Sequence, residues 1–154
     1  MGGESLTRVQ ISPSPPMKIT ICGSMSFYKE MRSVKESLEQ QGHMVLVPLG
    51  TDEEPPVEGR PGITKDELIA AKIECDFIRR HFKNIEHSDA ILILNYQKKE
   101  IDGYIGGNTF LEMGYAFGLG KKIFTLFPIP TMDYEAEMHA MQPIVIHGDL
   151  TKIQ

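Results

Sequence analysis

Residues that could do chemistry gather in the stretch IGGNTFLEMGYAFGLGKK, residues 105 to 122. Two glycines there allow close approach of a ligand to the backbone, and the polar pair after them can cap a helix. A carboxylate follows at a spacing that predicts its place in the first turn of that helix, near the mouth of a site. An acid that only completes a capping box or offsets the helix dipole has the same spacing. The residues concerned are Gly106, Gly107, Asn108, Thr109 and Glu112.

A second candidate segment, CGSMSF, joins an apolar run to an amphipathic one. Its backbone N–H groups and hydroxyls would lie at a helix N-terminus, where an anion or a sugar hydroxyl can bind. The expected substrate-binding residues are Gly23, Ser24, Met25 and Ser26. The chain lacks GxGxxG and GxxxxGK[ST] here, which excludes the dinucleotide and P-loop motifs. A tight turn with a serine N-cap is the alternative interpretation.

The elements that must position these residues alternate between short apolar runs and longer amphipathic ones. The expected strands are residues 17–22, 43–49, 90–94, 121–127 and 143–147. The expected helices are residues 26–41, 64–87, 108–119 and 133–141. A capping box of Thr64 and Glu67 starts the second helix, and the very apolar AILIL run predicts the central strand. The loop of residues 51–62, rich in Pro, Gly and acids, is expected to be a mobile lid.

Five strands with intervening helices predict an α/β fold, a flavodoxin-like or Rossmann-like three-layer sandwich with a five-stranded parallel sheet. Ligands of such sheets bind outside the carboxyl ends of the strands, where the strand order reverses. This rule selects three loops as the place of a site. They are residues 23–27, 95–108 and 127–132.

Composition limits the class of protein. The 154 residues leave room for about one domain, expected over residues 17–154 behind a disordered extension or tag remnant over residues 1–16. A net charge of -5 with scattered basic residues argues against a nucleic-acid partner. Two cysteines without metal-site spacing indicate a reducing compartment, and no apolar run approaches the roughly 20 residues that span a membrane. We expect a cytoplasmic protein with no metal, cofactor or membrane partner.

The segments together resemble the nucleoside 2-deoxyribosyltransferase family, including relatives that hydrolyse the N-glycosidic bond of deoxynucleoside monophosphates. The matching pieces are CGS after the first strand, SDAILIL, the Gly/Asn-rich residues leading to EMGYA, and GKKI. The resemblance implies that Glu112 is the nucleophile at the anomeric carbon. It also implies a flavodoxin-like fold, a small nucleoside or nucleotide as substrate, and a homodimer or larger homo-oligomer whose neighbouring subunits complete the site.

One position departs from the family pattern. Many members carry an aspartate eight residues before the aspartate of the S/A-D strand entry, where it handles the nucleobase or its proton. Counting back from Asp89, this chain has His81. A histidine can shuttle a proton near neutral pH, or the role could pass to Asp76 or to Asp102. An ordinary, partly buried helix residue is the other interpretation of His81.

Three functions therefore compete. The first is cleavage or transfer at the N-glycosidic bond of a (deoxy)nucleoside or nucleoside 5′-monophosphate through a glutamate nucleophile. The second is a phosphoribohydrolase that releases cytokinin bases, because GGNTxxE partly matches the loop of those enzymes. The third is a nucleotide-sensing module without catalysis. The sequence leaves open the sugar, the base, the need for a 5′-phosphate, and the choice between transfer and hydrolysis.

Overall fold

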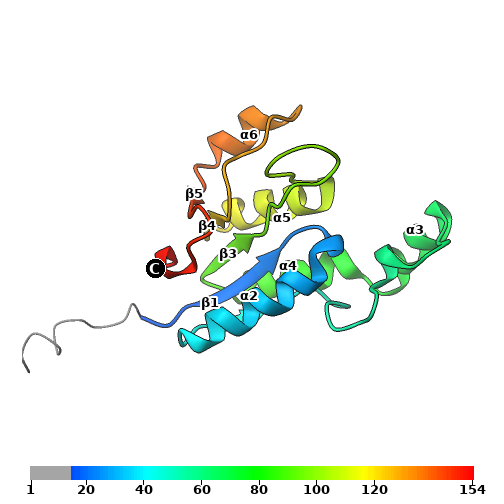
Figure 1. Cartoon of the computed structure of the whole chain (residues 1–154), viewed down its shortest axis with the longest axis horizontal. Helices are drawn as coiled ribbons and strands as arrows, with labels where there is room; N and C mark the ends of the chain where they lie inside the picture. Colours follow the sequence, from blue (N-terminus) through cyan, green and yellow to red (C-terminus); the bar gives the residue numbers. More distant parts are fainter. Residues whose placement is uncertain (1–14) are drawn as a thin grey trace, which may run out of the picture.

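A computed structural model describes residues 15–154 of the chain. The expected N-terminal extension lies outside the described residues, except for its last two positions. The described part confirms the α/β prediction, with strands and helices alternating along the chain (Figure 1). Among its helices, none has the length and apolar character that a membrane crossing requires.

The sheet contains five parallel strands in the order β2-β1-β3-β4-β5. Their bounds are β1 Lys18–Cys22, β2 Met44–Leu46, β3 Ala90–Ile93, β4 Lys122–Thr125 and β5 Ile144–Val145. The AILIL run forms the central strand β3, as predicted, and all four of its residues are buried because helices cover both faces. The order reverses between β1 and β3, where Cys22 pairs with Ile93, so the carboxyl ends of these two strands lie side by side.

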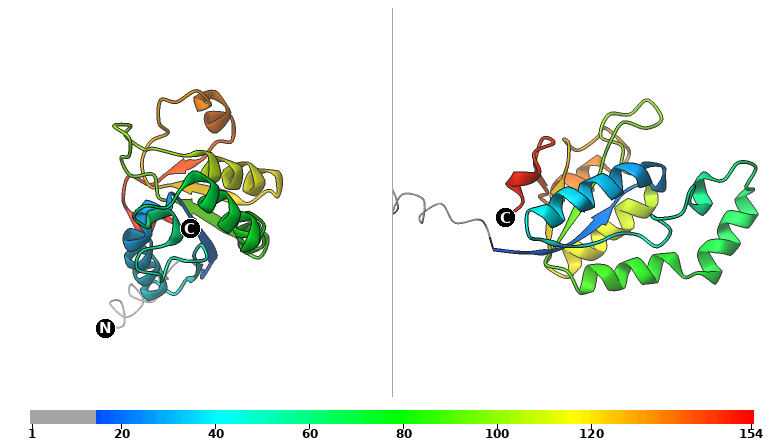
Figure 2. Two further views of the ribbon diagram at one scale, coloured as in Figure 1. Left: turned by 90° about the vertical axis from the view of Figure 1, so that its right-hand side faces the viewer. Right: turned by 60° about the horizontal axis from the view of Figure 1, so that its bottom comes forward.

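Helices cover the two faces of the sheet and bury two separate apolar clusters. On one face, the short helix η1 (Met25–Phe27) leads into α2 (Tyr28–Gln40), whose stripe of Met31, Val34 and Leu38 packs on the sheet. The other face is covered by α4 (Phe77–Glu86), α5 (Gly107–Gly118) and α6 (Glu135–Ala140). The left view of Figure 2 shows α2 and these helices on opposite sides of the strands. A short helix, η3 (Leu150–Lys152), ends the chain.

The prediction of one helix over residues 64–87 is wrong, because the segment forms two helices. The predicted start is confirmed, since Thr64 Oγ1 accepts a hydrogen bond from the Glu67 N–H at 3.1 Å at the beginning of α3 (Lys65–Glu74). Asp76 then adopts a left-handed conformation with φ of 51°, which breaks the helix before α4 begins. The break turns α3 away from the sheet, so its residues Ile69 and Ile73 are exposed, and α3 projects from the body (Figure 2).

Candidate active site

A cavity lies at the point where the strand order reverses. Its walls come from the loops after β1 and β2 and from α3, α4 and α5. The lining residues are Gly23, Met25, Pro48, Leu49, Gly50, Glu53, Pro56, Val57, Glu58, Lys72, Phe77, His81, Asn108 and Glu112. The loop over residues 51–62 therefore covers the cavity as predicted, with a short helix η2 (Val57–Gly59) inside it.

Glu112 lies one turn deeper than the sequence predicts. It is the sixth residue of α5, in the second turn, and only 5% of it is exposed. The capping interpretation fails because α5 has no acidic residue in its first turn, and its N-cap, Gly106, provides no side-chain hydrogen bond. Burial raises the pKa of Glu112 to about 8, so its carboxyl is mainly in the neutral form at pH 7.

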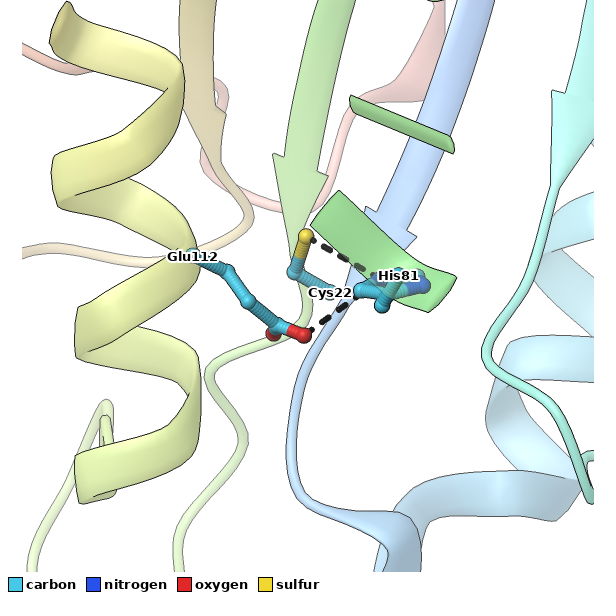
Figure 3. Close-up of side chains that lie close together, drawn as sticks. All are labelled: Cys22, His81 and Glu112. Carbon is cyan, nitrogen blue, oxygen red and sulfur yellow. Dashed lines mark hydrogen bonds and ion pairs between the residues drawn. The ribbon is translucent and has the colours of Figure 1, made fainter. Parts of the chain in front are cut away.

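His81 reaches the same point from α4 and is 4% exposed (Figure 3). Its Nε2 atom lies 3.0 Å from the carbonyl oxygen of Ile21 and 3.6 Å from Glu112 Oε2. The Asn84 amide lies 3.4 Å from Nδ1. A carbonyl only accepts, so Nε2 carries the proton, and Nδ1 accepts from Asn84. Burial lowers the pKa of His81 to about 4, which agrees with a neutral ring fixed in one tautomer.

Cys22 is the third member of this buried group, and the sequence marked it only as the first residue of the CGS piece, with no role of its own. It is the last residue of β1 and is fully buried, with its Sγ atom 3.5 Å from His81 Nε2. Burial raises the pKa of its thiol, and the neighbouring Glu112 raises it further. In an apolar strand the residue looks like a small hydrophobic side chain, so only the three-dimensional position reveals it.

Charged contacts hold the cover of the cavity in place. Lys72 of α3 pairs with Glu58 of the loop, and both side chains line the cavity. Lys72 lowers the pKa of Glu112 while Glu58 raises it. At the other end of the loop, Arg32 of α2 donates to the carbonyls of Thr51 and Glu53 and to the Glu54 carboxylate, each at 2.9 Å. The loop is thus held by polar contacts and little apolar packing.

The other expected site residues divide into three groups. Gly23, Met25 and Asn108 line the cavity with Glu112 and His81, whereas Asp76 and Asp102 lie on two other surface hollows. Five further residues lie at the starts of η1 and α5 without lining the cavity, namely Ser24, Ser26, Gly106, Gly107 and Thr109. The third expected loop, residues 127–132, borders the hollow of Asp102 and contributes nothing to the cavity.

The turn after β1 contacts the ammonium group of a lysine side chain. Lys98 Nζ donates to Ser24 Oγ at 2.6 Å, and Ser24 Oγ lies 2.9 Å from Ser26 Oγ. Ser24 is also the N-cap of η1, accepting from the Ser26 N–H. The turn therefore combines two hydroxyls with one ammonium group next to the cavity residues Gly23 and Met25.

Comparison with known proteins identifies the relatives of this fold and site. A sequence model described as nucleoside 2-deoxyribosyltransferase matches residues 21–142, a span that includes Cys22, His81 and Glu112. The chain belongs to this family. Membership places the protein among enzymes that act at the N-glycosidic bond of nucleosides or nucleotides. The resemblance inferred from the sequence is thereby confirmed.

Similar proteins occur among solved structures, but no curated protein matches. The CMP N-glycosidase BcmB of Clostridium botulinum is similar at 14% identity and a TM-score of 0.43, over 83% of this chain and 84% of that chain.

Proposed function

We propose that this family member cleaves the N-glycosidic bond of a (deoxy)nucleoside 5′-monophosphate, with Glu112 as the nucleophile. The observation that carries the proposal is a buried carboxyl group facing a cavity at the reversal of strand order, where ligands of such sheets bind. The acceptor is water or a second base, so the family's transfer reaction and hydrolysis share the first step.

In that step a Glu112 oxygen forms a bond to the anomeric carbon while the bond to the base nitrogen breaks. The electron pair leaves with the base, which takes up the proton that the Glu112 carboxyl gives up, and the sugar passes through a state with cationic character. The developing positive charge favours the ionised carboxylate, in a cavity that otherwise disfavours it. Water or a second base then attacks the same carbon and releases Glu112.

His81 acts in this proposal as a positioning residue. Its Nδ1 lone pair is engaged by Asn84 and its Nε2 proton by the Ile21 carbonyl, so neither nitrogen is free to exchange a proton with the base. A pKa near 4 also leaves the ring uncharged at neutral pH. The imidazole instead fills the space beside Glu112 and limits where its carboxyl group can turn.

The turn after β1 supports a phosphate on the substrate. Lys98, Ser24 and Ser26 do not line the cavity, but their ammonium group and hydroxyls lie on the turn that carries the lining residues Gly23 and Met25. Charge-assisted hydrogen bonds of this kind are the strong ones for an anionic oxygen. A 5′-monophosphate therefore fits this turn better than an uncharged nucleoside.

The test is a chromatographic assay of base release from a panel of nucleosides and 5′-monophosphates in both sugar series. We expect release from a monophosphate, and a loss of several orders of magnitude in Glu112→Gln. Glu36→Gln is the control, because Glu36 is an exposed carboxylate of α2 that does not line the cavity, and this variant should keep the rate within a few-fold. Binding of monophosphates without release would contradict the proposal in favour of a nucleotide sensor.

A further inference from the structure

Cys22, His81 and Glu112 form a buried group of three potential metal ligands from three elements, β1, α4 and α5. Their ligand atoms, one sulfur, one nitrogen and one oxygen, all lie within 4.8 Å of one another (Figure 3). A thiolate, an imidazole and a carboxylate are the three side-chain groups that zinc accepts in proteins. The group is therefore a set of suitable donors that converge on one point.

The spacing of the atoms fits a tetrahedral zinc ion. Zinc bonds of about 2.3 Å to sulfur and about 2.0 to 2.2 Å to nitrogen and oxygen place neighbouring ligand atoms about 3.4 to 3.6 Å apart. The observed separations are 3.5 Å from Cys22 Sγ to His81 Nε2 and 3.6 Å from His81 Nε2 to Glu112 Oε2. Two of the three edges of such a site thus match the separations for zinc, and the third, from Cys22 Sγ to a Glu112 oxygen, is within 4.8 Å.

We propose that Cys22, His81 and Glu112 bind one Zn²⁺ ion at the base of the cavity. His81 and Glu112 line the cavity, so a water or a small anion can supply the fourth ligand from that side. An ion on Nε2 takes the direction that points at the Ile21 carbonyl oxygen, 3.0 Å away, so this carbonyl must turn aside when the ion binds. The mixed sulfur, nitrogen and oxygen set selects zinc over magnesium or calcium, which prefer oxygen alone.

Asn84 is the residue that would orient the histidine. A ring that binds metal through Nε2 carries its proton on Nδ1 and needs an acceptor there. Asn84 lies 3.4 Å from Nδ1, and turning its amide presents the oxygen in place of the nitrogen. A carboxylate at this position would serve better, so Asn84→Asp should bind zinc more tightly than the wild type.

An ion at this place holds the carboxyl oxygen that the proposed reaction needs. Zinc should therefore inhibit base release, and a chelator should restore it. This consequence rests on the proposed function, whereas the binding of the ion does not. The two statements need separate measurements.

Binding is measured on the full reduced chain by titration with Zn²⁺ against a chromophoric chelator, and by absorption after loading with Co²⁺. We expect one ion per chain and a thiolate-to-cobalt charge-transfer band. Cys22→Ala, His81→Gln and Glu112→Gln should each weaken binding at least about tenfold. The matched controls are Cys75→Ala and His139→Gln, which alter the other free cysteine and an exposed histidine paired with Glu135. Both should bind as the wild type does.

Several results would overturn the zinc site. They are the absence of binding, a cobalt spectrum without the thiolate band, or loss of binding in Cys75→Ala but not in Cys22→Ala. Because the cobalt spectrum is taken on the wild type, it remains decisive if a variant fails to fold. Zinc that binds without slowing base release would refute the inhibitory role alone. A thiolate band in a protein that releases no base would support the ion site while refuting the proposed function.

Discussion

The Nε2 atom of His81 lies 3.6 Å from Oε2 of Glu112, and 4% and 7% of the two side chains are exposed. Two groups of opposite charge at this distance usually form an ion pair, yet burial favours the neutral form of each. The hydrogen bonds of His81 to Ile21 and Asn84 satisfy a neutral ring. The pair is therefore a neutral acid beside a neutral imidazole in the empty protein.

The free energy of unfolding should depend on pH through Glu112. The pKa values of Glu112 and His81 together define the pH range in which this dependence can be measured. Glu112 has a folded pKa near 8 against an ordinary 4.5, so its contribution is full below about pH 4.5 and is lost as pH rises to about 8. His81 has a folded pKa near 4 against 6.5, so its contribution rises with pH up to about 6.5. Between pH 6.5 and 8 only Glu112 of this pair changes stability.

Urea unfolding at several pH values tests this expectation. From pH 6.5 to 8 the wild type should lose up to about 1.4 kcal/mol of unfolding free energy per pH unit relative to Glu112→Gln. Glu53→Gln is the control, since that carboxylate is half exposed and should keep the wild-type slope. Parallel curves for wild type and Glu112→Gln would show that Glu112 is ionised throughout this range.

Lys72 and Glu58 should move the pH dependence of the reaction in opposite directions. Lys72 lowers the pKa of Glu112 and Glu58 raises it, so Lys72→Met shifts the rising limb of kcat to higher pH and Glu58→Gln shifts it lower. Each shift should reach up to about one pH unit. The double variant should return near the wild-type midpoint. Shifts of the same sign in the two single variants would contradict this account.

Lys98 should lower the KM for 5′-monophosphates without affecting the KM for nucleosides. Lys98→Met removes the ammonium group that donates to Ser24, and the KM for a 5′-monophosphate should rise about tenfold to a hundredfold. The KM for the corresponding nucleoside should stay the same. Lys99→Met is the matched control, because Lys99 is the neighbouring lysine and lies at the same 5.6 Å from the Tyr104 ring. Equal effects on both substrates would refute a phosphate contact.

Arg32 should hold the loop of residues 51–62 in place over the cavity. Arg32→Ala removes three contacts to residues 51–54, so amide hydrogen exchange over residues 51–62 should increase and the KM should rise. The strands of the sheet should keep their protection from amide hydrogen exchange. Glu36→Ala alters an exposed residue of the same helix and serves as control. Unchanged exchange in Arg32→Ala would show that other contacts fix the loop.

The projecting helix α3 gives a test of the expected homo-oligomer. Ile73 and Ile69 are 75% and 45% exposed, which makes an apolar face suited to a second subunit. Ile73→Asp should convert the oligomer to monomers in light scattering coupled to gel filtration. Met44→Asp, on the edge strand β2, is the control with a similar change at another exposed apolar residue. Dissociation by both variants or by neither would place the interface elsewhere.

The sequence predicted the sheet well because strand patterns depend on local composition. The AILIL run and the residue spacing of α2 sufficed for the central strand and for one covering layer. The break at Asp76 escaped prediction, since no glycine or proline marks it, although aspartate is one of the few other residues that adopt the left-handed region. The burial of Cys22 against His81 and Glu112 also depends on packing, because 90 residues of chain separate the first from the last.

The pairing of β1 with β3 has a consequence for how the site comes into existence. Cys22 ends one of these strands, and Glu112 follows the other through a loop and α5, so their approach requires that two distant parts of the chain have already docked. Such long-range contacts form late and together in folding. The buried group of Cys22, His81 and Glu112 is thus an all-or-none property of the completed domain. A partly folded chain should retain helix content while showing neither base release nor zinc binding, so both activities report directly on the native fraction.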